Sequence, residues 1–415
     1  MPNSHFNGDF GLSLEKHSSN FSKQFVILMT IFIDATGYAM IIPLLPFFAV
    51  SFNVGPLALG FLLNIFALMQ FIFSPIMGRL SDKYGRRKLL LLSISLSSLS
   101  FLMFTIATSY WFLFISRIFS GMATEISIAQ AYIADITTSK KRTSGLGKVR
   151  AAFSAGVIIG PSIGGFLSLI GYWAPGLLAI FLTLINLIFV YFFLPETRNN
   201  TNKEKVMNSQ MITQTNFIQN LKNAFKKPLL PYLLIIFFIT VLSFSAIPVL
   251  IPFVGIEFFN FSQIDLSFIF IFIGILQFVI QGFLVGRLSE RFGESVIIIL
   301  GSLFILAGLF LLPFLPYLIL FYLLIGGIST GNGFVRTAIP GVISRISSED
   351  EQGGFLGLAQ SVASFALIPG PIIAGFLYEY VGFFSPFIFS ALLLLISLIF
   401  SIKSYYQLKN HDFND

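Results

Sequence analysis

Long apolar segments separated by short polar breaks make up most of this chain of 415 residues. A helix needs roughly 20 apolar residues to cross a bilayer. Breaking the chain at Gly, Pro and charge clusters predicts twelve such helices, at 24–50, 55–77, 89–108, 110–134, 148–170, 173–194, 229–256, 264–285, 295–313, 316–340, 355–378 and 384–402. The sequence therefore predicts an all-α integral membrane protein.

Composition excludes several other classes of protein. Charged residues make up 10% of the chain and apolar residues 56%, whereas a soluble domain carries about 25% charged residues. The net charge of +7 comes from the polar breaks and no soluble basic module is present, so we expect no nucleic-acid partner. The chain has no Cys, and His5, His17 and His411 all lie in the tails, so we expect neither thiol chemistry nor a metal site. The sequence contains no recognisable pair of a nucleophile and a base, so we do not expect an enzyme.

The distribution of Lys and Arg predicts the orientation of the helices. With both termini in the cytoplasm, all 25 Lys and Arg except Arg117 and Arg336 fall in inside segments, as the positive-inside rule requires. The first 22 residues are polar, so we expect no cleavable signal peptide, and 1–23 is expected to be a cytoplasmic tail. The polar stretch 195–228 is expected to be a cytoplasmic linker, with a surface helix near Phe217–Phe225, and 403–415 a cytoplasmic tail.

The chain contains an internal repeat. The segment that starts at Gly78, GRLSDKYGRRK, has a partial copy, GRLSERFGES, that starts at Gly286, 208 residues later. Further pairs keep nearly the same offset: Gly160-Pro161 with Gly370-Pro371, and Gly171 and Pro175 with Gly382 and Pro386. The repeat predicts two pseudo-symmetric six-helix bundles, 24–194 and 229–402, an organisation common in secondary transporters.

These motifs together resemble the major facilitator superfamily, in particular its twelve-helix drug:proton antiporters, which include tetracycline-type efflux pumps. The resemblance rests on Gly78–Arg87 between helices 2 and 3, Asp34-Ala-Thr-Gly37 with Pro43-Leu-Leu-Pro46 in helix 1, Arg117-x-x-x-Gly121 in helix 4, Gly156–Gly165 in helix 5, Leu194-Pro-Glu-Thr197 after helix 6 and Glu351-Gln-Gly353 before helix 11. It implies alternating access between the two bundles. One departure is that 89–108 has no acid, although some tetracycline pumps carry one in helix 3.

The segment from 78 to 88 is expected to form a cytoplasmic gate loop. Gly78 and Gly85 permit a tight turn, and Asp82 can face a positive helix end. Arg86, beside Arg87, can pair with Asp135 at the cytoplasmic end of helix 4. The resemblance implies that this cluster holds the cytoplasmic side closed when the transporter faces outward. The alternative is that these charges only set the topology.

Gly156, Gly160 and Gly164 recur every four residues in helix 5, with Pro161 and Gly165 beside them. Small residues at this spacing let helices approach closely in a bilayer. The resemblance implies a tight seam between the two bundles, and ordinary close packing is the alternative.

Few charges lie within the predicted spans, and such charges usually face a cavity and serve function. Asp34 and Tyr38 share one face of helix 1, and Arg117, Gly121 and Glu125 form one stripe of helix 4. We predict that Asp34 and Glu125 are the proton-coupling acids, because a desolvated carboxyl exchanges protons near neutral pH. Asp34, Tyr38, Arg117, Glu125 and Asn332 are predicted to line the substrate cavity.

The sequence predicts a proton-coupled exporter of small amphipathic compounds in the bacterial cytoplasmic membrane. Its partners are the lipid bilayer, the substrate and protons, with no cofactor and a monomeric functional unit. Alternatives are a same-fold transporter of a metabolite or siderophore, in either direction, and a membrane sensor that does not transport.

Overall fold

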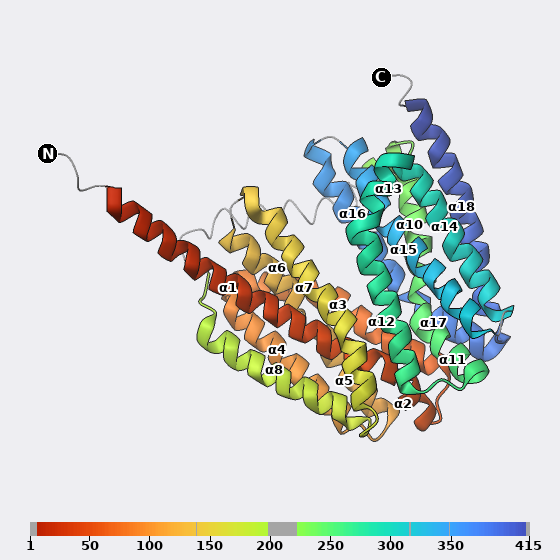
Figure 1. Ribbon diagram of the computed structural model, residues 1–415, viewed down its shortest axis with the longest axis horizontal. Coiled ribbons are helices and arrows are strands. Elements are labelled where there is room, and N and C mark those ends of the chain that lie inside the picture. Colours follow the sequence, from red (N-terminus) through yellow and green to blue (C-terminus); the bar gives the residue numbers. More distant parts are fainter. Residues whose placement is uncertain (1–5, 138, 198–221, 315–316, 348, 412–415) are drawn as a thin grey trace. The chain divides into compact units, whose positions relative to one another are not determined.

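The computed structural model describes residues 6–137, 139–197, 222–314, 317–347 and 349–411 (Figure 1). Within them lie twelve helices that are long and apolar enough to cross a membrane. Their bounds agree with the predicted spans to within a few residues at most ends, and the described residues contain no strand. The predicted all-α membrane fold is confirmed.

The first six spans contain two interruptions of regular α-helix. Pro43 lies in a 3₁₀ turn within span 1, and Ala123 and Thr124 interrupt span 4. The elements are α1 (Phe6–Ile41), η1 (Ile42–Leu44), α2 (Leu45–Ser51), α3 (Pro56–Tyr84), α4 (Arg86–Thr105), α5 (Tyr110–Met122), α6 (Glu125–Ile136), α7 (Ser139–Leu167) and α8 (Trp173–Phe193).

The last six spans include two π-helical turns, η3 and η5. The elements are α10 (Leu230–Ser245), α11 (Ile247–Phe259), α12 (Gln263–Val279), η3 (Ile280–Leu284), α13 (Val285–Phe292), α14 (Glu294–Leu311), η4 (Leu312–Phe314), α15 (Leu318–Ile346), α16 (Glu349–Leu367), α17 (Pro369–Phe376), η5 (Leu377–Val381) and α18 (Ser385–His411). Of the predicted surface helix at 217–225, the part from 222 is described and is helical, whereas 217–221 lies outside the described residues.

Contacts group the chain into two units. Unit 1 comprises Met1–Ile42 and Leu68–Asn199, and unit 2 comprises Pro43–Ala67 and Asn200–Asp415. Residues 43–67, which the sequence analysis placed in the first bundle, thus pack within unit 2. The cause is close backbone contact: a Cβ added to Gly60 would lie 2.5 Å from the Pro371 carbonyl oxygen. The division into six-helix bundles remains a prediction.

Each unit has its own apolar core. In unit 1, α1 packs along α7 and α8, and α4 packs along α5 and α8 (Figure 1). In unit 2, α14 packs along α15 and α18, and α10 packs along α16 and α18. Buried aliphatic side chains such as Ile27, Leu90 and Ile128 fill the core of unit 1.

Backbone conformation supports the internal repeat. Asn53 and Asn260 both adopt the left-handed conformation, with φ of 53° and 52°. Gly85 and Gly293, which precede α4 and α14, also have positive φ, at 109° and 81°. Residues about 207 or 208 positions apart therefore turn the chain in the same way.

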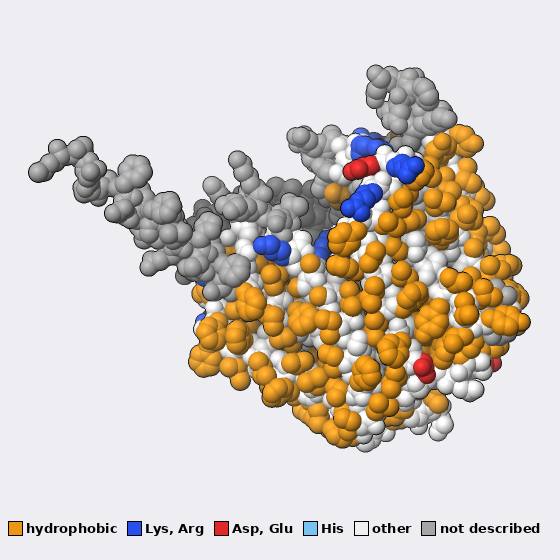
Figure 2. Space-filling view, viewed as in Figure 1, with side chains coloured by type: hydrophobic (Ala, Val, Ile, Leu, Met, Phe, Trp, Pro, Cys, Tyr) orange, Lys and Arg blue, Asp and Glu red, His pale blue; other side chains and the backbone are white. Residues whose placement is uncertain are grey.

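Hydrophobic side chains cover much of the face drawn in Figure 2, and the Lys and Arg side chains seen on unit 2 gather near α13. Ile319, Phe192 and Trp111 are among the most exposed large apolar residues, at 77%, 71% and 68%. Such a surface is favourable against lipid and unfavourable in water.

Candidate functional site

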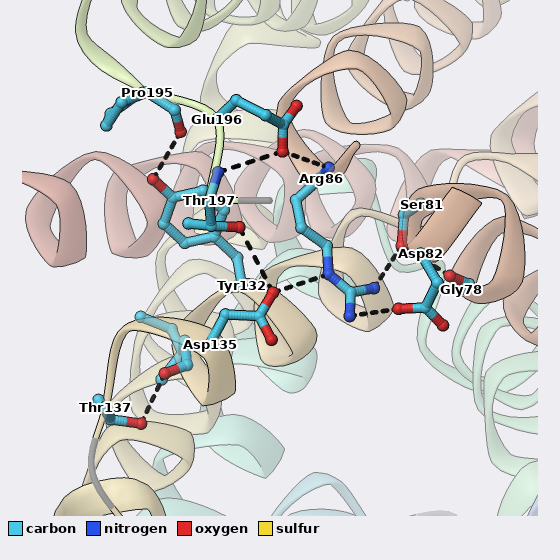
Figure 3. A network of polar contacts seen from close by, with 11 residues as sticks. Gly78, Ser81, Asp82, Arg86, Tyr132, Asp135, Thr137, Pro195, Glu196 and Thr197 are labelled. Atoms are coloured by element: carbon cyan, nitrogen blue, oxygen red, sulfur yellow. Dashed lines mark hydrogen bonds and ion pairs between the residues drawn. The ribbon is translucent and has the colours of Figure 1, made fainter. Parts of the chain in front are cut away.

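Arg86, the first residue of α4, lies at the centre of a polar network beside the α3–α4 turn (Figure 3). Its guanidinium donates hydrogen bonds to the Asp135 carboxylate at 3.0 Å and to the Ser81 hydroxyl at 2.6 Å, and pairs with Asp82. The predicted pair between Arg86 and Asp135 is present. It ties the start of α4 to the last turn of α6.

The turn itself is shorter than the predicted loop from 78 to 88. The helix α3 continues to Tyr84 and α4 begins at Arg86, so Gly85 is the one residue between them. Its φ of 109° is a conformation that other residues rarely adopt. Gly78 lies inside α3, so its predicted role in the turn was wrong.

Glu196 covers the N-terminus of α4. Its carboxylate accepts a hydrogen bond from the Arg86 backbone N–H at 2.8 Å and one from the Thr197 N–H at 3.2 Å. A side chain on Gly85 would collide with this carboxylate. A negative charge at a helix N-terminus is favourable, so the segment Leu194–Thr197 after α8 helps to stabilise the α3–α4 turn.

The end of α8 is fixed by two further contacts. The Tyr132 hydroxyl of α6 donates a hydrogen bond to the Pro195 carbonyl at 2.9 Å. The Arg87 guanidinium lies 5.3 Å from the centre of the Tyr191 ring and donates to the Tyr191 carbonyl. The ends of four helices, α3, α4, α6 and α8, thus meet in one network.

We predict that Glu196→Ala lowers the free energy of unfolding by about 1 kcal/mol, the usual cost of losing a helix cap. Thermal unfolding of the detergent-solubilised protein measures this loss as a lower melting temperature. Glu290→Ala, which removes an exposed carboxylate from α13, is the control and should leave the melting temperature unchanged. Equal melting temperatures for both variants would contradict the capping role.

The two predicted proton-coupling acids come together inside unit 1. Asp34 lies on α1 and Glu125 on α6, and the Ser97 hydroxyl of α4 lies between them. The Ser97 Oγ is 2.8 Å from Glu125 Oε1 and 3.4 Å from Asp34 Oδ1. Glu125 is only 2% exposed, so its charge is kept from solvent. Two carboxylates in one site repel each other when both are ionised, which favours a state with one proton between them.

A break in the fourth span positions Glu125. The sequence analysis assumed one continuous helix, but Ala123 and Thr124 leave the helical conformation and Glu125 begins α6. The Ser93 hydroxyl of α4 accepts a hydrogen bond from the Thr124 N–H at 2.8 Å, which satisfies a backbone group exposed by the break. In a bilayer, irregular backbone is tolerated only inside protein or along a cavity. The corresponding span in unit 2, α15, is continuous.

Arg117 is 1% exposed on α5 and interacts electrostatically with Tyr38 of α1. Tyr38 also interacts with Asp34, one turn earlier on the same helix. The structure therefore connects Arg117 with the acid pair through Tyr38. Four of the five residues predicted to line the substrate cavity lie in this region of unit 1.

Asn332, the fifth predicted cavity residue, lies on α15 of unit 2. It is fully buried, and its amide has no hydrogen bond within the described part of the chain. A small cleft in unit 2, with a volume of about 10 Å³, is lined instead by α10, α17 and α18, with Ser243, Gly370 and Ser390 among its residues. The assignment of a substrate cavity remains a prediction.

The glycine stripe of helix 5 packs against α1 within unit 1. A Cβ on Gly156 would lie 2.6 Å from the Phe32 carbonyl oxygen, and one on Gly160 would lie 2.7 Å from that of Thr36. Gly164 meets the Met40 backbone in the same way, and Pro161 and Gly165 are buried beside it. The close packing is therefore confirmed, whereas the predicted seam between the bundles remains untested.

Sequence reasoning missed Ser97, Ser93 and the capping role of Glu196. The signal for the two serines was present, since Ser93, Ser97 and Ser100 recur at i, i+4 and i+7 along an apolar span and are all buried. Nothing in the sequence indicated which of them faces an acid.

Comparisons with known proteins agree with this fold. The profile of the Major Facilitator Superfamily matches residues 27–338 and 282–409. The chain belongs to this superfamily of membrane transporters and is a transporter, not an enzyme.

Its relatives include proteins named for resistance to drugs. The chain is 31% identical to the class B tetracycline resistance protein of Escherichia coli, covering 87% of this chain and 89% of that one. It is 30% identical to multidrug resistance protein 2 of Bacillus subtilis, covering 90% and 92%. The crystal structure of a human organic anion transporter superposes with a TM-score of 0.65 at 21% identity, covering 92% and 99%, which supports the fold alone.

Proposed function

We propose that this transporter exports small amphipathic organic compounds in exchange for protons. The observation that carries the proposal is the buried pair of acids, Asp34 and Glu125, joined by Ser97 within a broken span. Acids at this depth are costly and usually serve transport. Relatives that are named for resistance to tetracycline and to multiple drugs support drug-like compounds as the class of substrate.

The coupling follows from the chemistry of the pair. A proton entering from outside neutralises the site, and the neutral site crosses between the outward-facing and inward-facing states without carrying a bare charge through hydrocarbon. Release of the proton inside restores the charge. The membrane potential contributes about 2.3 kcal/mol per charge per 100 mV, so proton entry can drive export against a gradient.

The remaining assignments complete the proposal. The protein spans the bacterial cytoplasmic membrane with both termini inside, works as a monomer and needs no cofactor. The network around Arg86, Asp82 and Asp135 holds the cytoplasmic ends of α3, α4 and α6 together in one state of the cycle.

Expression in a bacterial host that lacks its own efflux pumps tests the proposal. Tetracycline, as a polycyclic amphiphile, and ethidium, as an amphipathic cation, are suitable first probes, followed by a wider panel of compounds. We expect raised resistance to at least one compound and lower accumulation of it, both abolished by a protonophore. No resistance to any compound, or export that is insensitive to the protonophore, would contradict proton-driven drug export.

A further inference from the structure

We infer that the Ser97 hydroxyl is a proton relay through which Asp34 and Glu125 exchange a single proton. The inference rests on the proposed proton coupling and assigns a role to a residue that neither acid motif contains. Its basis is the position of one hydroxyl between two carboxyls that come from different helices, α1 and α6.

Counting hydrogens shows why the hydroxyl links the two acids. A serine hydroxyl has one hydrogen to donate and two lone pairs that accept. The shorter contact, 2.8 Å to Glu125, takes that hydrogen. The 3.4 Å contact to Asp34 then places a carboxyl oxygen opposite a lone pair of Ser97, and this is favourable when the carboxyl of Asp34 carries a proton.

The transfer balances without any other group. Asp34 gives its proton to Ser97 Oγ while Ser97 gives its own proton to the Glu125 carboxylate. One O–H bond breaks and one forms at each step, so Ser97 ends as a neutral hydroxyl. The negative charge moves from Glu125 to Asp34. Of the two contacts, the 3.4 Å one between Ser97 and Asp34 has to shorten by a few tenths of an ångström for the transfer.

The neighbours of the pair support this path. Ser93 of α4 accepts a hydrogen bond from the backbone N–H of Thr124, the residue before Glu125, and so helps to hold the start of α6 in place. Tyr38 of α1 interacts electrostatically with Asp34 and with Arg117 of α5, so these are the charged and titratable groups that the described residues place near the two acids. Glu125 is buried, and the relay gives it an exchange route through Asp34, which is partly exposed.

Two substitutions of nearly equal shape test the relay. Ser97→Thr keeps the hydroxyl, and Ser97→Val replaces it with a methyl group. Ser100→Ala is the control, because Ser100 is equally buried on α4 but its hydroxyl faces Ser116 at 3.5 Å. In proteoliposomes, transport of tetracycline or ethidium, whichever the wild type exports, is driven by a pH gradient. Equilibrium exchange of the same compound, which needs no net proton movement, is measured in parallel.

We expect Ser97→Val to slow gradient-driven transport about 100-fold or more, the scale of a lost proton-transfer group. Equilibrium exchange should stay within about twofold, and Ser97→Thr and Ser100→Ala should resemble the wild type. Equal driven transport by the Val and Thr variants would overturn the relay. So would a loss of exchange as large as the loss of driven transport, since that indicates a structural role. A wild type that moves no compound of the wider panel under the pH gradient would instead refute the proposed function.

Discussion

Asp34→Asn and Glu125→Gln are each expected to reduce gradient-driven transport by about 100-fold or more, the range that proton-transfer groups contribute. Each substitution keeps the shape of the side chain and removes its ability to bind and release a proton. Since the two acids share one site through Ser97, neither one replaces the other. Transport of tetracycline or ethidium into inverted membrane vesicles, energised by proton pumping, provides the measurement.

Asp265→Asn serves as the control for this prediction. Asp265 lies in the first turn of α12, where its carboxylate forms a capping box with Ser262 outside the acid pair. This variant is expected to keep transport at nearly the wild-type rate. Full gradient-driven transport by Asp34→Asn would remove Asp34 from the mechanism, and the same holds for Glu125→Gln.

Gly160→Leu is expected to prevent stable folding of unit 1. A Cβ at this position would lie 2.7 Å from both the Ala39 Cβ and the Thr36 carbonyl oxygen, and 3.0 Å from the Met40 backbone nitrogen. Backbone atoms of α1 cannot move aside as a flexible side chain does. Overpacking costs about 1–3 kcal/mol even where neighbours adjust, so a larger side chain here separates α1 from α7.

Gly147→Ala on the same helix provides a matched control, because an added Cβ there has no atom within 4 Å. It is expected to leave the melting temperature unchanged or slightly higher, since Ala favours helix. The measurement is the yield of monodisperse protein after detergent extraction, together with its thermal unfolding. Equal yield and melting temperature for Gly160→Leu and the wild type would contradict the close packing of α7 on α1.

The spans were predictable because hydropathy is a local property and a bilayer fixes the length of a helix. The ion pair between Arg86 and Asp135 was predictable because the predicted spans place both side chains at cytoplasmic ends of helices. The break before Glu125 was not predictable from the sequence, because Ala123 and Thr124 do not by themselves end a helix. The break depends on Ser93, a hydrogen-bond partner in another span.

The relay shows a second limit of sequence reasoning. A buried serine in an apolar helix most often bonds to its own backbone, as Ser245 does to the Leu242 carbonyl. Ser97 differs through its place between α1 and α6, which is a property of packing. The packing of 43–67 in unit 2 likewise depends on close backbone contacts, such as that of Gly60, that no local pattern indicates.

Simultaneous recording of proton and substrate fluxes in proteoliposomes tests whether this transporter exchanges its substrate for protons. With an outward substrate gradient of tetracycline or ethidium and no imposed pH gradient, the account predicts proton movement opposite to the substrate. The account further predicts that reversing the pH gradient reverses substrate movement, and that Asp34→Asn abolishes both effects. Substrate movement without any opposing proton flux, or proton flux that persists in Asp34→Asn, would contradict it.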